Sequence, residues 1–378
     1  MDSEKKKILE NKYQFKTNYT GDLVNFKKKI IEKKIIPHQV EFQAPPRGKK
    51  ICWLECPYCY GLSAEDTKER LEKTRGIDIL NQILEGGVKK IIFAGYATDP
   101  LNCSYIEDLL DLTISKKAIF GFNTKALRVS DKFLSILQKR EIIDGSYISL
   151  SIDAGSNETY NKIHAVKSSS NLYDKVLENV KNLGQIRKTK NFDMSAAYLV
   201  NINSANSYDY EKFINDFMEA GCNLLRFTFP QQPKDIKTAK GVVPTENEIA
   251  HYKKKLEELK KKYSNSDCSI LVIDADSDNN IYNKPRTVPC YARYVYPTVG
   301  FDGWLYNCSQ SSAPNFRSSA LGDLTKSDFW DLFYNYENDN FESFSKKCNI
   351  KINNSGCRCD RKEHVVNASI IKSEIFKN

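Results

Sequence analysis

The chain of 378 residues is long enough for one large domain and a smaller one, and 40% apolar with 28% charged residues is the composition of a soluble globular protein. No apolar run approaches the roughly 20 residues of a membrane span, and the lysine-rich start lacks the apolar core of a secretion signal. We therefore expect a cytoplasmic protein without membrane contact, whose thiols stay reduced.

The positive charge is concentrated at the start of the chain. The formal net charge is +9, and residues 1–50 carry thirteen Lys and Arg against six Asp and Glu, which leaves +7. A nucleic-acid surface is one interpretation. We favour a solvated lysine-rich leading segment, placed at 1–35, because no arginine-rich, Gly/aromatic or zinc-finger pattern accompanies it. Nucleic acid is therefore not expected as a partner.

Six short runs rich in Val, Ile, Leu and Phe predict strands, with stretches of helical periodicity between them. The predicted strands are 50–54, 90–94, 118–123, 147–152, 193–201 and 223–229. The predicted helices are 77–84, 132–138, 172–183 and 208–220. Strands separated by helices indicate repeated βαβ units on a parallel sheet. Six units are too few for a closed eight-fold barrel, so the pattern predicts an α/β fold, either an open partial barrel or a doubly wound sheet.

Small and polar residues follow the ends of these strands. They are the cysteines of 52–59 after the first strand, 95–100 after the second, Thr124, Asp153, and then Asn201 with Asn203. In parallel α/β folds, ligand-binding residues gather at the carboxyl ends of the strands. We therefore expect the functional site at this mouth.

The pattern changes after Pro244. Thr245 and Glu248 form a capping box, and the residues that follow recur at helical spacing, namely Ile249, Tyr252, Leu256 and Leu259. The stretch "YPTVGFDGWLYNC" then predicts a hairpin that turns at Asp302 and Gly303. We expect a barrel at 36–240, a helical linker with a strand at 241–285, and a small C-terminal domain at 286–378.

Eleven cysteines are many for an intracellular chain, and clustered thiols in a reducing compartment indicate metal. "ICWLECPYCYG", residues 51–61, holds Cys52, Cys56 and Cys59. Structural zinc needs a closed four-ligand shell, and no histidine lies in this loop. Three thiolates suit a [4Fe–4S] cluster with one iron left open. The alternative is three buried thiols that only pack.

This stretch resembles the signature of radical S-adenosylmethionine (SAM) enzymes, CxxxCxxC with an aromatic residue, here Tyr58, before the third cysteine. "IFAGYATDPL" stands where that family has a glycine-glycine-glutamate motif, and "ISLSIDAGSNETYNKIHAVK" resembles its fourth-strand segment. The resemblance covers about 35–235. It implies a partial (β/α)6 TIM-like barrel whose three cysteines hold a [4Fe–4S] cluster that binds and cleaves SAM, supplied with electrons by a flavodoxin or ferredoxin.

The resemblance also implies further SAM contacts. They are Tyr58, Gly95, Tyr96, Thr98, Asp99, Ser151, Asp153, Asn201 and Arg226. The glycine-rich motif departs from the family, because Gly-Tyr-Ala-Thr-Asp-Pro replaces Gly-Gly-Glu-Pro. Ser151 and Asp153 could equally be ordinary polar residues that end a strand, and Arg226 could form a surface ion pair.

A second group of cysteines lies in the C-terminal part: Cys290, Cys308, Cys348, Cys357 and Cys359. Their surroundings resemble the twitch domain, the shortened form of the SPASM extension, which is a small α+β domain for auxiliary clusters. The resemblance implies one auxiliary [4Fe–4S] cluster on Cys290 and Cys308, completed by Cys357 with Cys359 or by Cys348 with either. Zinc is the main alternative, since four thiolates suit it too.

Three cysteines stand alone. Cys103 follows a strand at the expected mouth and is a candidate hydrogen-atom donor, as epimerising relatives require; the alternative is packing. Cys222 and Cys268 precede strands and should lie at the opposite end. His164 sits at a helix start and is interpreted as structural.

The substrate is predicted less directly. About fifty residues precede the cysteine triplet, too few for the leader-binding module of peptide-modifying relatives. We therefore expect a small-molecule or carbohydrate substrate and net oxidation, with crosslinking or epimerisation of a ribosomal peptide as the alternative. The rival from another class is a non-enzymatic Fe–S or zinc module that binds nucleic acid.

Overall fold

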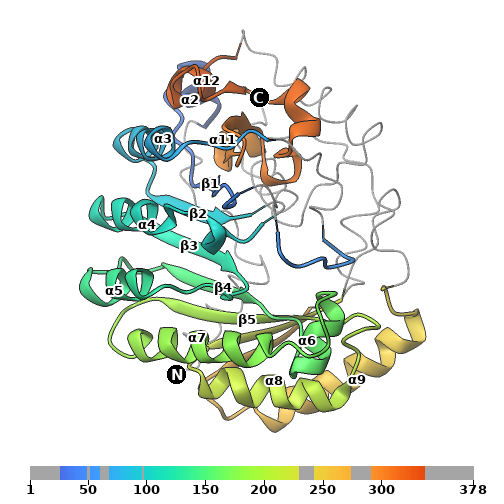
Figure 1. Ribbon diagram of the computed structural model, residues 1–378. Coiled ribbons are helices and arrows are strands. Elements are labelled where there is room, and N and C mark those ends of the chain that lie inside the picture. Colours follow the sequence, from blue (N-terminus) through green and yellow to red (C-terminus); the bar gives the residue numbers. More distant parts are fainter. Residues whose placement is uncertain are drawn as a thin grey trace.

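The computed structural model describes residues 26–48, 52–59, 68–95, 98–229, 242–273 and 291–336 (Figure 1). Their centre is one ten-stranded sheet in the order β10-β9-β8-β1-β2-β3-β4-β5-β6-β7. The strands are β1 Val40–Gln43, β2 Lys90–Ala94, β3 Ile119–Thr124, β4 Tyr147–Ser151, β5 Asp193–Leu199, β6 Leu224–Thr228, β7 Ser269–Ile273, β8 Thr298–Val299, β9 Trp304–Tyr306 and β10 Gly322–Asp323. Strands β1 to β7 run parallel, β8 is parallel to β1, and β9 and β10 are antiparallel to their neighbours.

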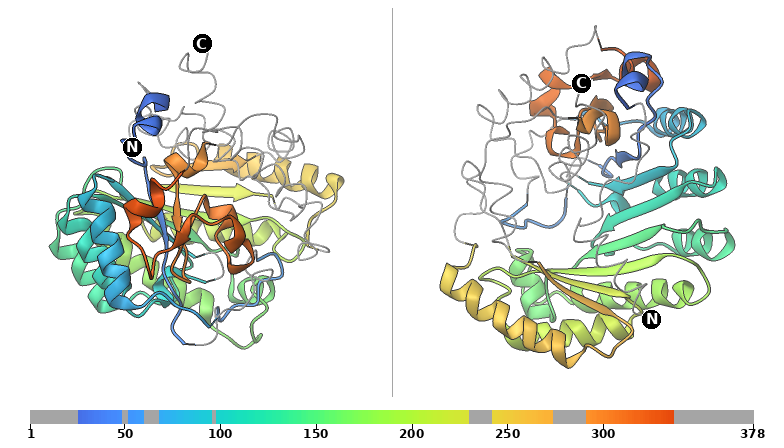
Figure 2. Two further views of the ribbon diagram at one scale, coloured as in Figure 1. Left: turned by 90° about the horizontal axis from the view of Figure 1, so that it is seen from above. Right: turned by 180° about the vertical axis from the view of Figure 1, so that it is seen from behind.

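Helices cover the outer, convex side of this curved sheet (Figures 1 and 2). They are α3 Lys73–Glu85, α4 Ile106–Ser115, α5 Asp131–Lys139, α7 Leu172–Arg187, α8 Ser207–Glu219 and α9 Glu246–Lys262. The other described α-helices are α2 Phe26–Ile31, α6 Asn157–Ile163, α11 Ala292–Val295 and α12 Phe329–Phe333. The arrangement is a mixed α/β fold of the partial TIM-like kind, as the sequence predicted. No described helix has the length and apolar character needed to cross a membrane.

The hydrophobic core lies between the sheet and these helices. Phe93 on β2 and Phe122 on β3 have ring centroids 4.8 Å apart, and Phe133 on α5 meets Phe122 edge-on at 5.2 Å. All three rings are buried. Such aromatic pairs bury large areas in fixed geometry, so this packing holds the strand ends rigidly.

The opposite, inner face of the sheet carries a polar cluster on β4, β5 and β6. Successive strand residues point to opposite faces, so Ser149 points away from Ile148 and Leu150, which belong to the core. Ser195 on β5 and Arg226 on β6 both donate hydrogen bonds to Ser149, each at 3.2 Å. Hydrogen-bonding groups therefore line the concave side.

Most predicted elements are confirmed, with one strand in the wrong place. The strand expected at 50–54 is wrong: residues 52–54 form no strand, and the first strand is Val40–Gln43, paired with β2. Pro45 and Pro46 come shortly after β1, and proline lacks the backbone N–H that hydrogen bonds between strands need. The strand expected within 241–285 is β7, which adds a seventh parallel strand beside β6.

The signals at the two C-terminal elements are also confirmed. The capping box opens α9: Thr245 N donates to Glu248 Oε2 at 2.7 Å, and Glu248 N donates to Thr245 Oγ1 at 3.3 Å. The hairpin at Asp302 and Gly303 joins β8 and β9.

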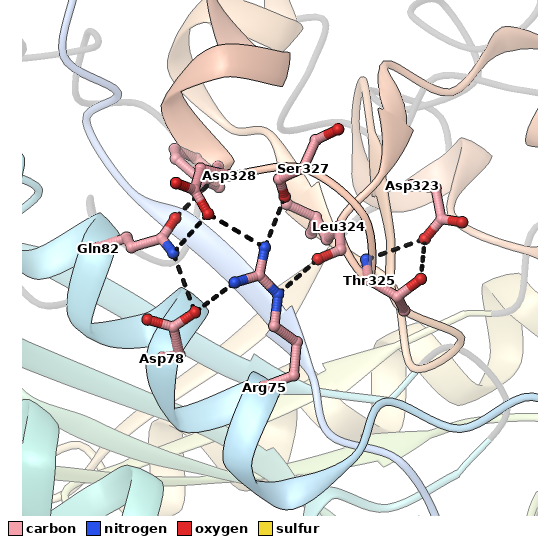
Figure 3. Close-up of polar contacts among 9 residues, drawn as sticks. Arg75, Asp78, Gln82, Asp323, Leu324, Thr325, Ser327 and Asp328 are labelled. Carbon is pink, nitrogen blue, oxygen red and sulfur yellow. Dashed lines mark hydrogen bonds and ion pairs between the residues drawn. The ribbon is translucent and has the colours of Figure 1, made fainter.

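A polar cluster fastens the C-terminal segment to α3 (Figure 3). Arg75 donates from Nε to the Leu324 carbonyl and from Nη2 to the Ser327 carbonyl, both at 2.7 Å, and also pairs with Asp78 and Asp328. One guanidinium thus satisfies two backbone carbonyls on a segment about 250 residues away, which fixes residues 322–336 against the barrel.

Candidate active site

The cysteine loop, residues 52–59, is tied to the rest of the chain at Trp53 and Glu55 and closed by an internal turn at Cys59. Glu55 N donates to the His164 carbonyl at 3.2 Å, and Cys59 N donates to the Cys56 carbonyl at 3.0 Å. The guanidinium carbon of Arg128 lies 3.1 Å from the centroid of the Trp53 ring, a cation–π contact. These contacts fix the loop beside the elements that follow β3 and β4.

The three thiols of the loop are buried to different degrees: Cys56 is buried, and Cys52 and Cys59 are half-buried. Burial raises the pKa of Cys52 and of Cys56, to about 11 for Cys56, and the neighbouring Cys59 raises both further. Among the described residues, no three His, Cys, Asp or Glu side chains converge as the ligands of a single metal ion do. A [4Fe–4S] cube gives each thiolate its own iron, so three cluster ligands do not have to converge on one point.

Asp153, after β4, connects the cysteine loop to two strands. Its Oδ2 accepts hydrogen bonds from Tyr58 Oη at 2.9 Å and from Lys125 Nζ at 3.3 Å, and its Oδ1 accepts one from Leu199 N at 3.0 Å. The residue is 5% exposed and has a φ of +65°. A left-handed backbone is unfavourable for a non-glycine residue and is kept where surrounding contacts demand it.

Lys125, directly after β3, is the cation of this site. Its Nζ donates to the Ser151 carbonyl at 3.1 Å and forms the ion pair with Asp153. Burial alone would lower the pKa of Lys125, but the charges of Asp153 and Cys56 raise it above its ordinary value. The side chain therefore stays protonated.

His164 lies between the loop and the end of β4. Its Nε2 is 3.2 Å from the Ile152 carbonyl, which can only accept, so this nitrogen carries the proton. Its Nδ1 then faces Cys56 Sγ at 3.1 Å and Tyr58 Oη at 3.3 Å. Burial, and after it the charge of Lys125, lowers the pKa of His164 well below the ordinary value. The ring is a neutral acceptor in contact with the loop.

The turn after β2 is closed by Asp99. Its carboxylate accepts hydrogen bonds from Leu101 N, Thr124 Oγ1 and Lys125 N, at 2.9, 2.7 and 2.6 Å. Burial raises the pKa of Asp99 in spite of these donors. A side chain that already binds three groups of the chain acts chiefly as a clamp between this turn and the end of β3.

Two more residues expected near the cofactor belong to the same turn. A Cβ on Gly95 would lie 1.6 Å from the Thr98 carbonyl oxygen, so this turn requires glycine. The hydroxyl of Thr98 accepts from Asn102 Nδ2 at 3.3 Å. Tyr96 lies outside the described residues.

The last expected contacts lie farther along the sheet. Ser151 reaches the site through its carbonyl, which binds Lys125. Asn201 is fully buried after β5, where its Oδ1 accepts from the backbone of Asn203 and Ser204 and closes a turn. Arg226 lies on the inner face, bound to Ser149.

Four other cysteines lie in the described part of the chain. Cys103 is completely buried in the core, and burial raises its pKa to about 12. Cys222 and Cys268 are buried before β6 and β7, at the opposite end of the sheet, as expected. The thiol of Cys308 lies 3.5 Å from Ser311 Oγ. The other expected auxiliary ligands lie outside the described residues: Cys290, Cys348, Cys357 and Cys359.

The segment that carries Cys308 reaches the barrel. Gln43, the last residue of β1, donates from Nε2 to Ser312 Oγ at 2.6 Å. Both side chains are buried. The C-terminal segment therefore lies against the carboxyl end of β1, on the same edge of the sheet as the cysteine loop.

Sequence reasoning missed two residues of this site. Lys125 was not singled out, although it follows Thr124 at the end of a predicted strand, which was a usable signal. His164 was interpreted as structural, and no local pattern indicates that its ring touches a cysteine 108 residues earlier.

Comparisons with known proteins agree with this geometry. Residues 49–195 match the family model described as the radical SAM superfamily. No curated protein sequence matches the chain.

Solved structures share the fold at low sequence identity. SuiB of Streptococcus suis, bound to the precursor peptide SuiA, is 14% identical with a TM-score of 0.59, over 84% of this chain and 68% of SuiB. The enzyme anSMEcpe with bound AdoMet is 16% identical with a TM-score of 0.54, over 81% of this chain and 83% of the other. The cysteine loop, at the carboxyl edge of the parallel sheet, lies inside the segment 49–195 that is similar to the radical SAM superfamily.

Proposed function

We propose that the chain is a radical SAM enzyme in which Cys52, Cys56 and Cys59 hold a [4Fe–4S] cluster with one open iron. The observation that carries the proposal is the loop itself: one buried and two half-buried thiols within eight residues, inside the segment that matches the superfamily. When bound, the cluster supplies the electron that cleaves SAM to methionine and a 5′-deoxyadenosyl radical, which abstracts a hydrogen atom from the substrate.

The residues of the chain have separate roles in this proposal. Tyr58 and His164 fix the loop, and Asp153 joins it to β3 and β5 through Lys125 and the Leu199 amide. Burial of these groups excludes water and competing hydrogens, which radical chemistry demands. Gly95 and Asp99 shape the turn against which SAM would lie, and Ser151, Asn201 and Arg226 remain further proposed SAM contacts.

For the substrate, we propose a small molecule or a carbohydrate that undergoes net oxidation. The polar inner face, with the hydroxyls of Ser149 and Ser195, supports a substrate rich in hydrogen-bonding groups. A peptide is the second candidate, because structures of the same fold contain the peptides SuiA and Cp18Cys. We further propose a cytoplasmic enzyme reduced by a flavodoxin or ferredoxin.

We also propose one auxiliary [4Fe–4S] cluster on Cys308, Cys290 and two of Cys348, Cys357 and Cys359. The contact between Gln43 and Ser312 supports it, because it brings the neighbourhood of Cys308 to the edge of the sheet that holds the cysteine loop. Four thiolates would make this cluster an electron conduit, and a vacant iron would make it a substrate anchor.

The central test is anaerobic reconstitution followed by dithionite and SAM. The wild-type protein should release 5′-deoxyadenosine, Cys56→Ala should not, and Cys268→Ala should behave as wild type because that thiol is buried at the far end. If an iron-loaded wild-type protein forms no 5′-deoxyadenosine, the proposal of a radical SAM enzyme is refuted, and the alternative of a non-enzymatic Fe–S or zinc binding module is favoured.

Iron and sulfide counting tests the auxiliary cluster. Cys308→Ala should lower the iron content from about eight to about four atoms per chain. The matched control is again Cys268→Ala. An unchanged iron content, or zinc in place of iron, would rule the second cluster out. Transfer of deuterium into 5′-deoxyadenosine from labelled sugars or labelled peptides then separates the two substrate classes.

A further inference from the structure

Lys125 brings a buried positive charge to the edge of the cysteine loop. Four contacts connect it to Cys56, through Asp153, Tyr58 and His164, at 3.3, 2.9, 3.3 and 3.1 Å. The side chain of Lys125 is 18% exposed and that of Asp153 is 7% exposed. Charges at this depth are poorly screened by salt and act over several ångströms.

Two acids lie beside this positive charge. Asp153 divides its carboxylate among Tyr58, Lys125 and the Leu199 amide. Asp99 accepts hydrogen bonds from backbone and hydroxyl donors. The ammonium of Lys125 and these two carboxylates therefore act on the loop with opposite signs, and Lys125 supplies the positive contribution.

We propose that Lys125 raises the reduction potential of the cluster held by Cys52, Cys56 and Cys59, an inference that rests on the proposed function above. Reduction transfers one electron from a low-potential carrier, such as a flavodoxin, a ferredoxin or dithionite, and makes the cluster one charge more negative without forming or breaking a bond. A fixed positive charge nearby stabilises that product more than the oxidised state. Lys125 thus acts on the cluster through its positive charge and need not touch SAM or the substrate.

The inference makes opposite predictions for the two members of the ion pair. Removing the charge of Lys125 should shift the midpoint potential to more negative values. Removing the charge of Asp153 should shift it to more positive values, because one negative charge near the cluster is then gone. A purely structural pair would give no such pair of opposite shifts.

The experiment is an anaerobic redox titration of reconstituted protein without SAM. The EPR signal of the reduced cluster monitors the titration and gives the midpoint potential. Lys125→Met should titrate at a more negative midpoint and Lys125→Arg near the wild type. Lys132→Met is the matched control, because Lys132 is exposed on α5 and pairs with Asp108 rather than with Asp153.

The outcomes separate this inference from the proposed function. A wild-type protein that takes up no iron would refute the proposed function and this inference with it. Iron-loaded Lys125→Met with an unchanged midpoint would overturn the inference alone. If Lys125→Met takes up no cluster, the Asp153→Asn variant tests the inference instead. A midpoint potential of Asp153→Asn that is not more positive than that of the wild type contradicts the role of Lys125.

Discussion

The hydroxyl of Tyr58 donates a hydrogen bond of 2.9 Å to the carboxylate of Asp153, although 95 residues separate them. This contact ties the cysteine loop to the end of β4. Because Asp153 also holds Lys125 and the Leu199 amide, one carboxylate fixes the loop relative to three strands.

Asp153→Asn should destabilise the protein strongly. The substitution keeps the shape of the side chain but leaves the ammonium of Lys125 buried without its counter-ion, which typically costs about 3 kcal/mol. Urea unfolding should show this loss as a lower midpoint with an unchanged slope. Lys132→Met, which removes an exposed pair, should change stability by less than about 1 kcal/mol. Equal losses in both variants would contradict the role given to Asp153.

Patterns within one element predicted most of the fold. Alternating apolar residues marked β2 to β6, and Thr245 with Glu248 marked the start of α9. β1 was misplaced because it has only four residues, too few to stand out beside the apolar residues of the cysteine loop. The position of a short strand depends on its pairing and packing with other elements, which the local sequence pattern does not show.

The site was predictable only as far as motifs reach. The cysteine spacing gave the loop and its chemistry. The contacts of Lys125 with Asp153 and of His164 with Cys56 join residues 28 and 108 positions apart, and no periodicity encodes them. Asp99 was expected to contact SAM, and that stays a prediction; its hydrogen bonds with Leu101, Thr124 and Lys125 follow from tertiary packing that the sequence pattern does not show.

Arg75→Leu should loosen the C-terminal segment from α3. The substitution removes two hydrogen bonds to the partly buried backbone carbonyls of Leu324 and Ser327, which then lack their charged donor. We expect the free energy of unfolding to fall by about 2 kcal/mol. Hydrogen exchange should speed up locally in residues 322–330. Lys73→Leu is the control on the same helix, since Lys73 makes an exposed pair with Asp108; comparable exchange in both variants would be evidence against the clamp.

His38 should make stability depend on pH. Burial, and after it the charge of Lys90, lowers its pKa from 6.5 to about 4. Between these values the unfolded chain binds a proton that the folded chain does not, so stability should fall as the pH drops from 6.5 towards 4. The urea midpoint, followed across this window, should depend less on pH in His38→Gln. His251→Gln, on exposed α9, should keep the wild-type slope; an unaltered slope in His38→Gln would count against this assignment.

Gly95→Ala should weaken SAM binding by about tenfold, or about 1.4 kcal/mol. The added Cβ would meet the Thr98 carbonyl at 1.6 Å, so the turn that carries Thr98 and Asp99 has to open. Equilibrium dialysis with SAM measures the effect. Gly184→Ala is matched, because its Cβ would meet the Ala220 carbonyl at 1.9 Å between α7 and α8; it should lower stability yet bind SAM normally while folded. Normal SAM binding by Gly95→Ala would show that this turn is not part of the SAM site.

Cys103→Ala tests whether this thiol returns hydrogen to the substrate. Its side chain is 0% exposed and belongs to the core behind β2, where a substrate radical cannot reach it without local unfolding. We expect a loss of about 1 kcal/mol in stability from the small cavity. In deuterated water, product formed by the variant should carry as much deuterium as wild-type product. If deuterium disappears from the product while 5′-deoxyadenosine still forms, Cys103 is the donor, and the chain around it must open during turnover.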